Sequence, residues 1–519
     1  MWENSWIIEK IKDQKNLILV LLLYTFLAII LFSHYKYVIN SDGIAYISIA
    51  KHYLNGHISY AINGYWSPLY SWLLIPFIYS WPGNIGNVMV TKVLAIVLGL
   101  LTLLAVNSIL DKLSFDIRQK TIILLALIPF MLFSTFYFVS PDLLVACILL
   151  YYFNYLIDNN YRKSTSLGVI TGILGVMAFL AKSYCFYFFL VHFVLVNLFF
   201  MKNFPKDRSV IKKNLLLGLS IFLVISGVWA GIISEKYGEV TVGTSGSYNY
   251  AIMGPEYNDH VMRYQILSPP NEFAVSSWED PSYFKVKKWS PLESKQNFTH
   301  LIMIIFDNIW RIILISGFSV FIPFLVITLS LYLFFKSDRK SIRNNLILIL
   351  GTMIIYAGGY ILIIILIRYL FFVFLLSFLM GFYSLNMLFK ENIIKPKFVK
   401  LISILLVLLL FFYPILLMSY YSDGHSDGFF KIKKSLDLKS QGIRGNIASN
   451  GEWERMDNYC YYLDSKYYGV TKNQSGVELK DTLMRYDIDY YFVWGKSYDD
   501  YLGDIVYRDE YLVVYRIKK

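Results

Sequence analysis

Charged residues are scarce in this sequence, and long apolar runs take their place. Of its 519 residues, 16% are charged and 56% are hydrophobic. This composition excludes a chain built only from ordinary soluble domains of about 100–200 residues. Apolar runs of about 20 residues, long enough to cross roughly 30 Å of hydrocarbon, recur from Leu17 to Tyr420 and then stop. A bilayer is therefore the expected solvent for most of the chain.

Cysteine is rare as well, and the motifs of several enzyme classes are missing. The three cysteines, Cys147, Cys185 and Cys460, stand far apart and predict no disulfide framework. The sequence contains no phosphate-cradling glycine-rich loop, no zinc-protease histidine pair and no nucleophile elbow. A nucleotide-driven pump is therefore disfavoured.

The apolar runs predict a polytopic all-α membrane domain of about eleven transmembrane helices. Each run has to be helical, because backbone groups left unpaired in lipid cost several kcal/mol apiece. Hydrophobic patterning places the helices at residues 17–38, 87–110, 120–138, 142–158, 165–182, 184–201, 213–235, 314–335, 345–366, 369–389 and 400–420.

Basic residues gather in the short links between alternate helices. The links at 202–213 and 390–400, for example, are rich in lysine, whereas the links on the other side of the membrane are poor in it. The positive-inside rule then places the N-terminus in the cytoplasm. We expect the membrane to be the plasma membrane of the cell. An odd number of helices leaves the C-terminus outside. The net charge of +12 thus reflects orientation rather than binding to nucleic acid.

Three outer segments are long enough to hold a functional site. Residues 39–86 include an amphipathic stretch at 44–54, which predicts a helix along the membrane surface. Residues 236–300 are rich in Gly, Pro, Tyr and Trp, as a lid or a binding loop would be. Residues 421–519 alternate strand-like and helical runs. The chain therefore divides into a transmembrane domain over 1–420 and a small extracytoplasmic α/β domain over 421–519.

Two acidic residues stand at predicted outer helix ends. Asp42 follows the first helix, and Asp142 opens the fourth. Each has a structural interpretation, because a capping or first-turn carboxylate stabilises a helix N-terminus. The functional alternative is a general base or a metal ligand held at the membrane surface. The residues alone leave both interpretations open.

Two cations stand at other outer helix ends. Lys182 and Arg368 are suited to stabilise the charge on a departing lipid phosphate. Lys182 is also long enough to snorkel to the interface, and Arg368 to hold Asp307 or a backbone carbonyl. We interpret His52 and His57 as polar groups of the interface, because two histidines five residues apart on a helix do not share a face well.

Short motifs recur in a fixed order along the membrane domain. They are Ser41-Asp42-Gly43, Tyr46, Gly56, Trp66-Ser67-Pro68-Leu69-Tyr70, Ser140-Pro141-Asp142, Ala181-Lys182 and Arg368-Tyr369. In this order and position the sequence resembles membrane glycosyltransferases of the GT-C fold. The similarity is to the family-39-like branch related to protein O-mannosyltransferases and the lipid A aminoarabinose transferase, and it covers roughly residues 5–420.

The resemblance implies a fold and a reaction. Residues 1–420 would form a GT-C-like catalytic domain that takes a sugar from a polyprenyl-phosphate donor. The acceptor would be a glycan, a lipid or a protein, with membrane lipids as further partners and no nucleic acid. The sugar would be transferred with inversion of its anomeric centre.

The resemblance also implies roles for single residues. Asp42 looks like the catalytic base and Asp142 like the second acid of the site, while Lys182 and Arg368 look like the groups that hold the donor phosphate. The aromatic residues expected to bind substrate are Tyr46, Tyr65, Trp66 and Tyr369. No cofactor is certain. A divalent metal ion is a candidate, with Asp42 and Asp142 as its ligands if it is present.

Two other functions compete with the glycosyltransferase. One is a transporter or flippase for a lipid-linked sugar, and the other is a non-catalytic glycan-binding assembly protein. Transporters tend to place paired ionisable residues near the bilayer midplane and to contain internal repeats. The sequence shows no clear repeat, and its charges gather at outer helix ends. We therefore favour an enzyme acting at the membrane surface.

Overall fold

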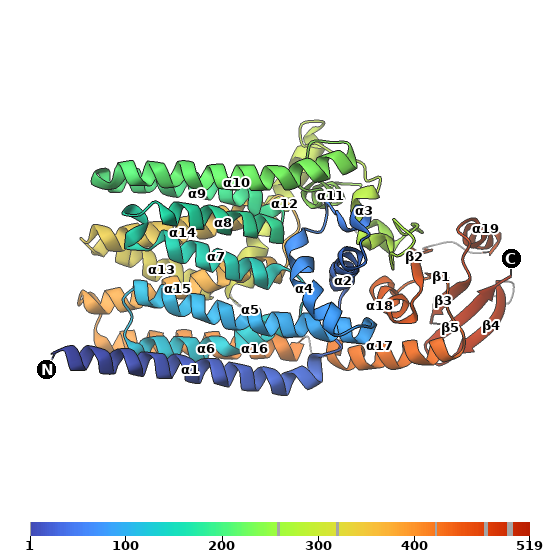
Figure 1. Cartoon of the computed structure of the whole chain (residues 1–519), viewed down its shortest axis with the longest axis horizontal. Helices are drawn as coiled ribbons and strands as arrows, with labels where there is room; N and C mark the ends of the chain where they lie inside the picture. The colour runs from blue at the N-terminus through green and yellow to red at the C-terminus, as the bar shows by residue number, and fades with distance from the viewer. Residues whose placement is uncertain are drawn as a thin grey trace.

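Long helices lie side by side in one bundle, with a small sheet domain at one end of it (Figure 1). The computed structural model describes residues 2–256, 260–317, 321–420, 423–471, 476–495 and 502–518. We call the end of the bundle that carries the sheet the domain end, and the other the opposite end. The N-terminus lies at the opposite end.

The bundle confirms a polytopic all-α membrane domain. Among the described residues, nine helices are long and apolar enough to cross a membrane, and three shorter apolar helices accompany them. Large apolar side chains such as Leu19 and Val224 are exposed on the circumference of the bundle, as lipid-facing residues would be. The helices are α1 (Trp2–Tyr35), α5 (Asn84–Lys112), α6 (Ile117–Phe136), α7 (Asp142–Leu156), α8 (Ser166–Ala181), α9 (Tyr184–Asn203), α10 (Arg208–Tyr237), α12 (Lys295–Gly317), α13 (Phe321–Lys336), α14 (Lys340–Tyr360), α15 (Phe371–Lys390) and α16 (Pro396–Tyr420).

One predicted span differs from the structure. In place of a single helix at 314–335, α12 begins at Lys295, inside the predicted loop, and α13 follows it. Asn308 in α12 donates to the carbonyl of Ile361, 2.8 Å away and just beyond α14. The Tyr413 hydroxyl donates to the carbonyl of Ile315 at 3.3 Å. These hydrogen bonds tie α12 to the bundle, and α12 is itself long and apolar enough to cross a membrane.

A layer of short helices covers the domain end of the bundle. It consists of α2 (Ser41–Leu54), α3 (Ile58–Ala61) and α4 (Pro68–Ser80). The helix predicted at 44–54 exists, but most of its residues are buried, so it does not lie exposed on a membrane surface. It lies between the bundle and the sheet domain (Figure 1). A Cβ on Gly43 would come within 2.7 Å of the Val139 side chain, so this close approach requires glycine.

The segment from 238 to 294 is mostly irregular, as the sequence predicted. It contains the short helix α11 (Ser245–Ile252) and three single turns, η3 (Val261–Arg263), η4 (Ser277–Glu279) and η5 (Pro281–Tyr283). Elsewhere, single turns connect helices of the bundle: η1 (Asn159–Arg162), η2 (Pro205–Asp207) and η6 (Ile367–Leu370). We refer to residues 238–294 as the loop segment.

The C-terminal part is a small α/β domain. It contains α17 (Asp423–Ser440), β1 (Asn446–Ser449), α18 (Trp453–Leu463), β2 (Lys466–Val470), α19 (Gly476–Arg485), β3 (Tyr490–Trp494), β4 (Gly503–Arg508) and β5 (Leu512–Ile517). The strand order is β2-β1-β3-β5-β4. Strand β1 is parallel to β2 and β3, whereas β5 is antiparallel to β3 and β4. The predicted boundary at 421 falls on residues 421 and 422, outside the described residues.

Candidate functional site

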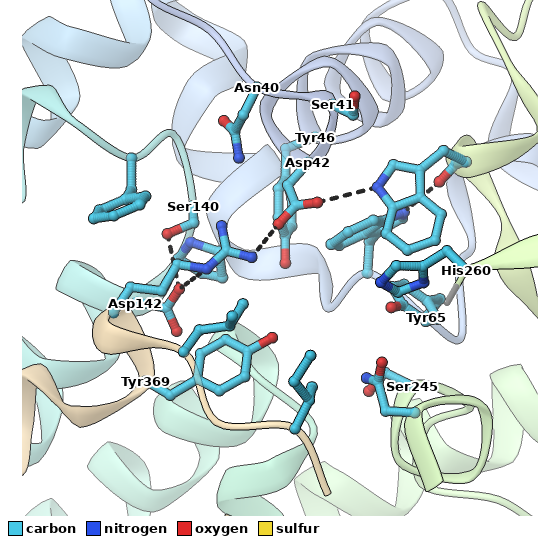
Figure 2. A pocket seen from close by; sticks show the side chains of 18 of the residues that line it. Asn40, Ser41, Asp42, Tyr46, Tyr65, Ser140, Asp142, Ser245, His260 and Tyr369 are labelled. Carbon is cyan, nitrogen blue, oxygen red and sulfur yellow. Dashed lines mark hydrogen bonds and ion pairs between the residues drawn. The ribbon is translucent and has the colours of Figure 1, made fainter. Parts of the chain in front are cut away.

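A cavity of about 460 Å³ opens at the domain end (Figure 2). Residues from the bundle, α2, the loop segment and α18 line it. All eight residues that the sequence singled out for catalysis or substrate binding are among them: Asp42, Tyr46, Tyr65, Trp66, Asp142, Lys182, Arg368 and Tyr369. The fold thus brings together residues that lie more than 300 positions apart in the chain.

Asp42 lies in the first turn of α2, and its carboxylate contacts two side chains. Asn40 is the N-cap, and no side chain caps this helix, so Asp42 does not act as the cap. Its Oδ2 accepts a hydrogen bond from Nη2 of Arg368 at 2.5 Å. Its Oδ1 accepts one from Nε1 of Trp278 at 3.0 Å. The dashed lines from Asp42 in Figure 2 mark both contacts.

Asp142, at the start of α7, is surrounded by donors. Its Oδ1 lies 2.6 Å from Nζ of Lys182, and its Oδ2 accepts a hydrogen bond from the Ser140 hydroxyl at 2.8 Å. Nε of Arg368 is 3.4 Å from the same Oδ2. Arg368 therefore bridges the two acids. The four charged side chains, between 4% and 19% exposed, are formally neutral together.

The structure decides between the alternatives for the two cations. Nζ of Lys182 lies 3.5 Å from the ring centroid of Tyr369 as well as against Asp142, so the side chain faces the cavity and does not snorkel. Arg368 holds Asp42, whereas Asp307 pairs with Arg311 at 2.7 Å. Both cations therefore belong to the cavity.

Four helices begin at the cavity wall. Their first or capping residues, Ser41 of α2, Asp142 of α7, Ser183 before α9 and Ser245 of α11, all line it. Helix N-termini carry partial positive charge and unpaired N–H groups, so they attract anions. In addition, Nε of Arg368 is buried without a hydrogen-bond partner among the described residues. The charges of the two acids and the two cations cancel. The partial positive charge of the helix N-termini therefore suits the cavity to one more anion.

Three of the four predicted aromatic residues, Tyr46, Tyr65 and Trp66, form one wall of the cavity. Tyr46 packs edge-on against Trp66, with ring centroids 5.1 Å apart, and Tyr65 against Trp66 at 4.6 Å. All three are less than 9% exposed, so they present ring edges rather than open faces. Such a wall limits the shape of what enters and leaves little surface for stacking a sugar.

Several cavity residues were not found from the sequence. They come from the loop segment (His260, Arg263, Trp278) and from α18 (Trp453, Glu454). Nothing in the local sequence indicates that these positions meet Asp42. The acidic and aromatic cluster Trp278-Glu279-Asp280 was the one available signal. The interpretation of His52 as an interface residue was wrong, because its ring is buried 3.0 Å from Glu279.

Asp457 of α18 lies buried behind the cavity, next to the hydroxyls of Ser41 and Ser276. Burial raises the pKa of this carboxyl to about 7, although those two hydroxyls lower it. The carboxyl therefore changes charge near neutral pH, next to the first turn of the helix that holds Asp42.

Few side chains of the cavity are of the kinds that bind a metal ion. Within the described part of the chain, no group of three or more His, Cys, Asp and Glu residues is arranged to hold a metal ion. Asp42 and Asp142 are both paired with cations, which occupy the positions where a metal would bind. These residues do not fit a metal ion as they stand, and the divalent metal stays a candidate only.

Comparisons with known proteins find similarity only among solved structures. No protein-family model matches this sequence, and no characterised protein matches it by sequence. An oligosaccharyltransferase from Archaeoglobus fulgidus in the apo form is 12% identical, with a TM-score of 0.48; the match covers 94% of this chain and 70% of that one. ArnT from Cupriavidus metallidurans bound to undecaprenyl phosphate is 13% identical, with a TM-score of 0.49, and 95% and 97% of the two chains are covered.

A third solved structure is the archaeal oligosaccharyltransferase AglB from Archaeoglobus fulgidus in complex with an inhibitory peptide and a dolichol-phosphate. It is 12% identical, with a TM-score of 0.47, and the match covers 94% of this chain and 70% of that one. Similarities of this size carry no argument about function, which has to come from the residues of the site.

Proposed function

We propose that this protein is a membrane glycosyltransferase. It would transfer a sugar from a polyprenyl-phosphate donor to the hydroxyl of a glycan, lipid or protein acceptor, with inversion at the sugar carbon. The observation that supports this proposal is the meeting of two acids and two cations in one cavity at the domain end of the bundle. The charge distribution along the chain favours an extracytoplasmic location for this end and a cytoplasmic N-terminus.

In the proposed reaction, Asp42 is the general base. The acceptor hydroxyl oxygen attacks the anomeric carbon as its proton passes to a carboxylate oxygen of Asp42. The bond between that carbon and the phosphate oxygen breaks, and its electron pair leaves with the lipid phosphate. Asp142 takes no proton in this scheme, because its two oxygens hold Lys182 and Ser140 in place.

Arg368 and Lys182 receive the developing negative charge. The donor phosphate competes with Asp42 for the guanidinium of Arg368, whose buried Nε has no hydrogen-bond partner among the described residues. As Arg368 turns to the phosphate, Asp42 loses a stabilising cation and becomes a better base. Preorganised charges of this kind are worth more in a cavity from which water is largely excluded.

The acceptor would enter from the side of the sheet domain. The cavity lining on that side comes from the loop segment and α18, with Trp453 and Glu454. The opposite side carries Lys182 and Tyr369, and in the proposal it receives the lipid phosphate. The acceptor hydroxyl would then attack the face of the anomeric carbon opposite the departing phosphate, as inversion requires.

The transporter hypothesis is less well supported. A carrier needs charges along a path through the bilayer, whereas the paired charges of the cavity lie at one end. In the described part of the chain, Lys92 and His192 are buried inside the bundle. Both are satisfied by local partners: Lys92 donates to the carbonyl of Phe136, and His192 contacts Tyr152 and Thr352.

The decisive experiment is a turnover assay with purified protein. The protein would be supplied with a panel of undecaprenyl-phosphate sugars and membrane-derived acceptors, and release of undecaprenyl phosphate would be measured. We expect Asp42→Asn to lower kcat by about 10²–10⁴-fold, the usual contribution of a general base, with donor binding retained. Asp207→Asn, at the opposite end of the bundle, should keep wild-type turnover.

Two results would overturn the proposal. Wild-type turnover in Asp42→Asn would show that this carboxylate is not the base. Movement of a labelled lipid-linked sugar across a vesicle membrane, without release of the polyprenyl phosphate, would favour the flippase.

A further inference from the structure

The loop segment carries a residue that contacts Asp42 directly. Trp278 is 5% exposed, and its indole N–H donates to Oδ1 of Asp42 at 3.0 Å. Its main-chain carbonyl accepts a hydrogen bond from Nε1 of Trp66, also at 3.0 Å. The ring lies edge-on to His260 and to Trp453 of the sheet domain. The side chain of Trp278 is thus held on several sides, with its one polar atom on Asp42.

The next residue anchors this contact to the same helix that carries Asp42. The Glu279 side chain is 4% exposed and accepts hydrogen bonds from Ser48, from Nε2 of His52 at 3.0 Å and from Asn271 at 2.8 Å. Ser48 and His52 lie further along α2. A buried carboxylate is tolerated only when it is paired and hydrogen bonded. Glu279 therefore fixes the loop segment against α2 below the Asp42–Trp278 contact.

Further contacts fix the segment on its other sides. Asp280 accepts a hydrogen bond from the Tyr237 hydroxyl at 2.6 Å, which ties the segment to the end of α10. Asn63 donates to the main-chain carbonyl of Glu279 at 2.8 Å. Each residue from 278 to 280 therefore contacts at least one element of the membrane domain.

The sheet domain holds the same segment from outside. Strand β2 is an edge strand, and its free edge pairs with the loop segment through the bridges Ile266–Gly469 and Ser276–Tyr467. The amide of Tyr467 donates to the carbonyl of Val275 at 2.7 Å. An edge strand with unpaired backbone groups is a ready template for such pairing. The second bridge ends two residues before Trp278.

We propose that Trp278 is a positioning residue for Asp42, and that the buried Glu279–His52 pair keeps Trp278 in place. The inference rests on the proposed function, in which Asp42 is the base. In the structure, Arg368 holds one oxygen of Asp42 and Trp278 the other. When the donor phosphate draws Arg368 away, the indole N–H still holds the carboxylate, so that a lone pair keeps facing the acceptor hydroxyl.

The test removes the indole N–H group of Trp278 and keeps an aromatic ring in its place. Trp278→Phe should lower kcat by about 10–100-fold, because a slightly misplaced catalytic group costs up to about 10²-fold. The KM for the donor should change less than about threefold, since Trp278 does not contact the phosphate in this scheme.

The same loop segment offers a matched control. Trp289 is also buried, and its Nε1 donates to the carbonyl of Tyr250 at 2.8 Å, but it does not line the cavity. Trp289→Phe removes a ring nitrogen and a hydrogen bond of the same kind. We expect kcat and the donor KM of this variant to match the wild type. Glu279→Gln should reproduce the effects of Trp278→Phe in weaker form.

A second measurement needs no turnover. The indole ¹⁵N–H resonance that disappears in Trp278→Phe should shift in Asp42→Asn and stay in place in Asp207→Asn. An unchanged resonance in Asp42→Asn would overturn the inference, and so would a wild-type kcat in Trp278→Phe while Asp42→Asn is inactive. Full activity of Asp42→Asn would instead show that Asp42 is not the general base, and would refute the proposed function.

Discussion

The two ends of the bundle keep their charges in different ways. At the opposite end, the ion pairs Lys112–Asp158, Arg162–Asp207 and Arg339–Glu391 each include side chains more than 20% exposed. Lys120 is buried there, but its partners Asp13 and Asp111 are 29% and 48% exposed. At the domain end, by contrast, Asp42, Asp142, Lys182 and Arg368 are all below 20% exposure and contact one another.

This difference separates charges that orient the chain from charges that can do chemistry. An exposed ion pair contributes about 0–1 kcal/mol, so the basic end needs only the right sign of charge. Burying an ion pair costs free energy that a pair of apolar side chains would not cost. Selection for stability alone does not favour such a cluster, whereas a reaction that generates negative charge requires one.

The largest expected effect comes from removing the cation shared by both acids. Arg368→Met leaves Asp42 and Asp142 without their bridging partner, and we expect a loss of about 3–5 kcal/mol in the free energy of unfolding. Turnover should be abolished as well. Arg339→Met at the opposite end removes an arginine that is 69% exposed, and its cost should stay below about 1 kcal/mol. Thermal unfolding in detergent would measure both.

A double variant sharpens this prediction. Adding Asp42→Asn to Arg368→Met removes the carboxylate that has lost its ion pair with Arg368, so part of the lost stability should return while activity does not. If both arginine variants lost equal stability, the contrast between the two ends would be wrong.

A second effect, on the pH dependence of stability, has opposite signs at the two ends. Burial raises the pKa of Asp457 to about 7, against the hydroxyls of Ser276 and Ser41. The folded state therefore binds this proton more tightly than the unfolded state, and stability falls as pH rises from about 4 to about 7. Asp457→Asn should raise the free energy of unfolding at pH 8 by up to about 4 kcal/mol, with little change near pH 4.

Asp158 at the opposite end supplies the comparison. Partial burial raises its pKa, but hydrogen bonds from Lys112 and from the backbone amide of Asn160 outweigh this and lower it. Its contribution is present above about pH 4 and lost as the pH falls. Asp158→Asn should therefore destabilise the protein at pH 8, by less than about 1 kcal/mol because the pair is partly exposed. Unfolding curves at both pH values would show whether the two variants differ in sign.

The sequence was sufficient for most of the bundle and for part of the candidate site. Hydrophobic runs report on the solvent of each segment directly, so the membrane helices were found to within a few residues, apart from the first part of α1 and most of α12. Asp42, Asp142, Lys182 and Arg368 could be singled out because a charge next to a membrane helix is rare. Most of α12 was missed, because Asp307 and Arg311 interrupt its apolar run.

The rest of the site depends on contacts that have no local signature. Trp278, Trp453 and Asp457 lie in segments that read as a loop and a small domain, and only the folded chain places them at Asp42. His52 was misjudged for the same reason, since its partner Glu279 is far away in the sequence. Charges beside membrane helices are therefore predictable, and the residues that position them are not.

The smallest of the three effects concerns the donor phosphate. Lys182 contributes one hydrogen bond to Asp142 and lies over the ring of Tyr369, with its ammonium facing the cavity. Lys182→Met keeps the length of the side chain, and we expect it to weaken binding of undecaprenyl phosphate by about 10–100-fold, the worth of a hydrogen bond to a charged group. Lys112→Met, which breaks the Lys112–Asp158 pair at the opposite end, should bind as the wild type does. Calorimetric titration with undecaprenyl phosphate in detergent measures both affinities, and equal affinities for the two variants would place the phosphate away from Lys182.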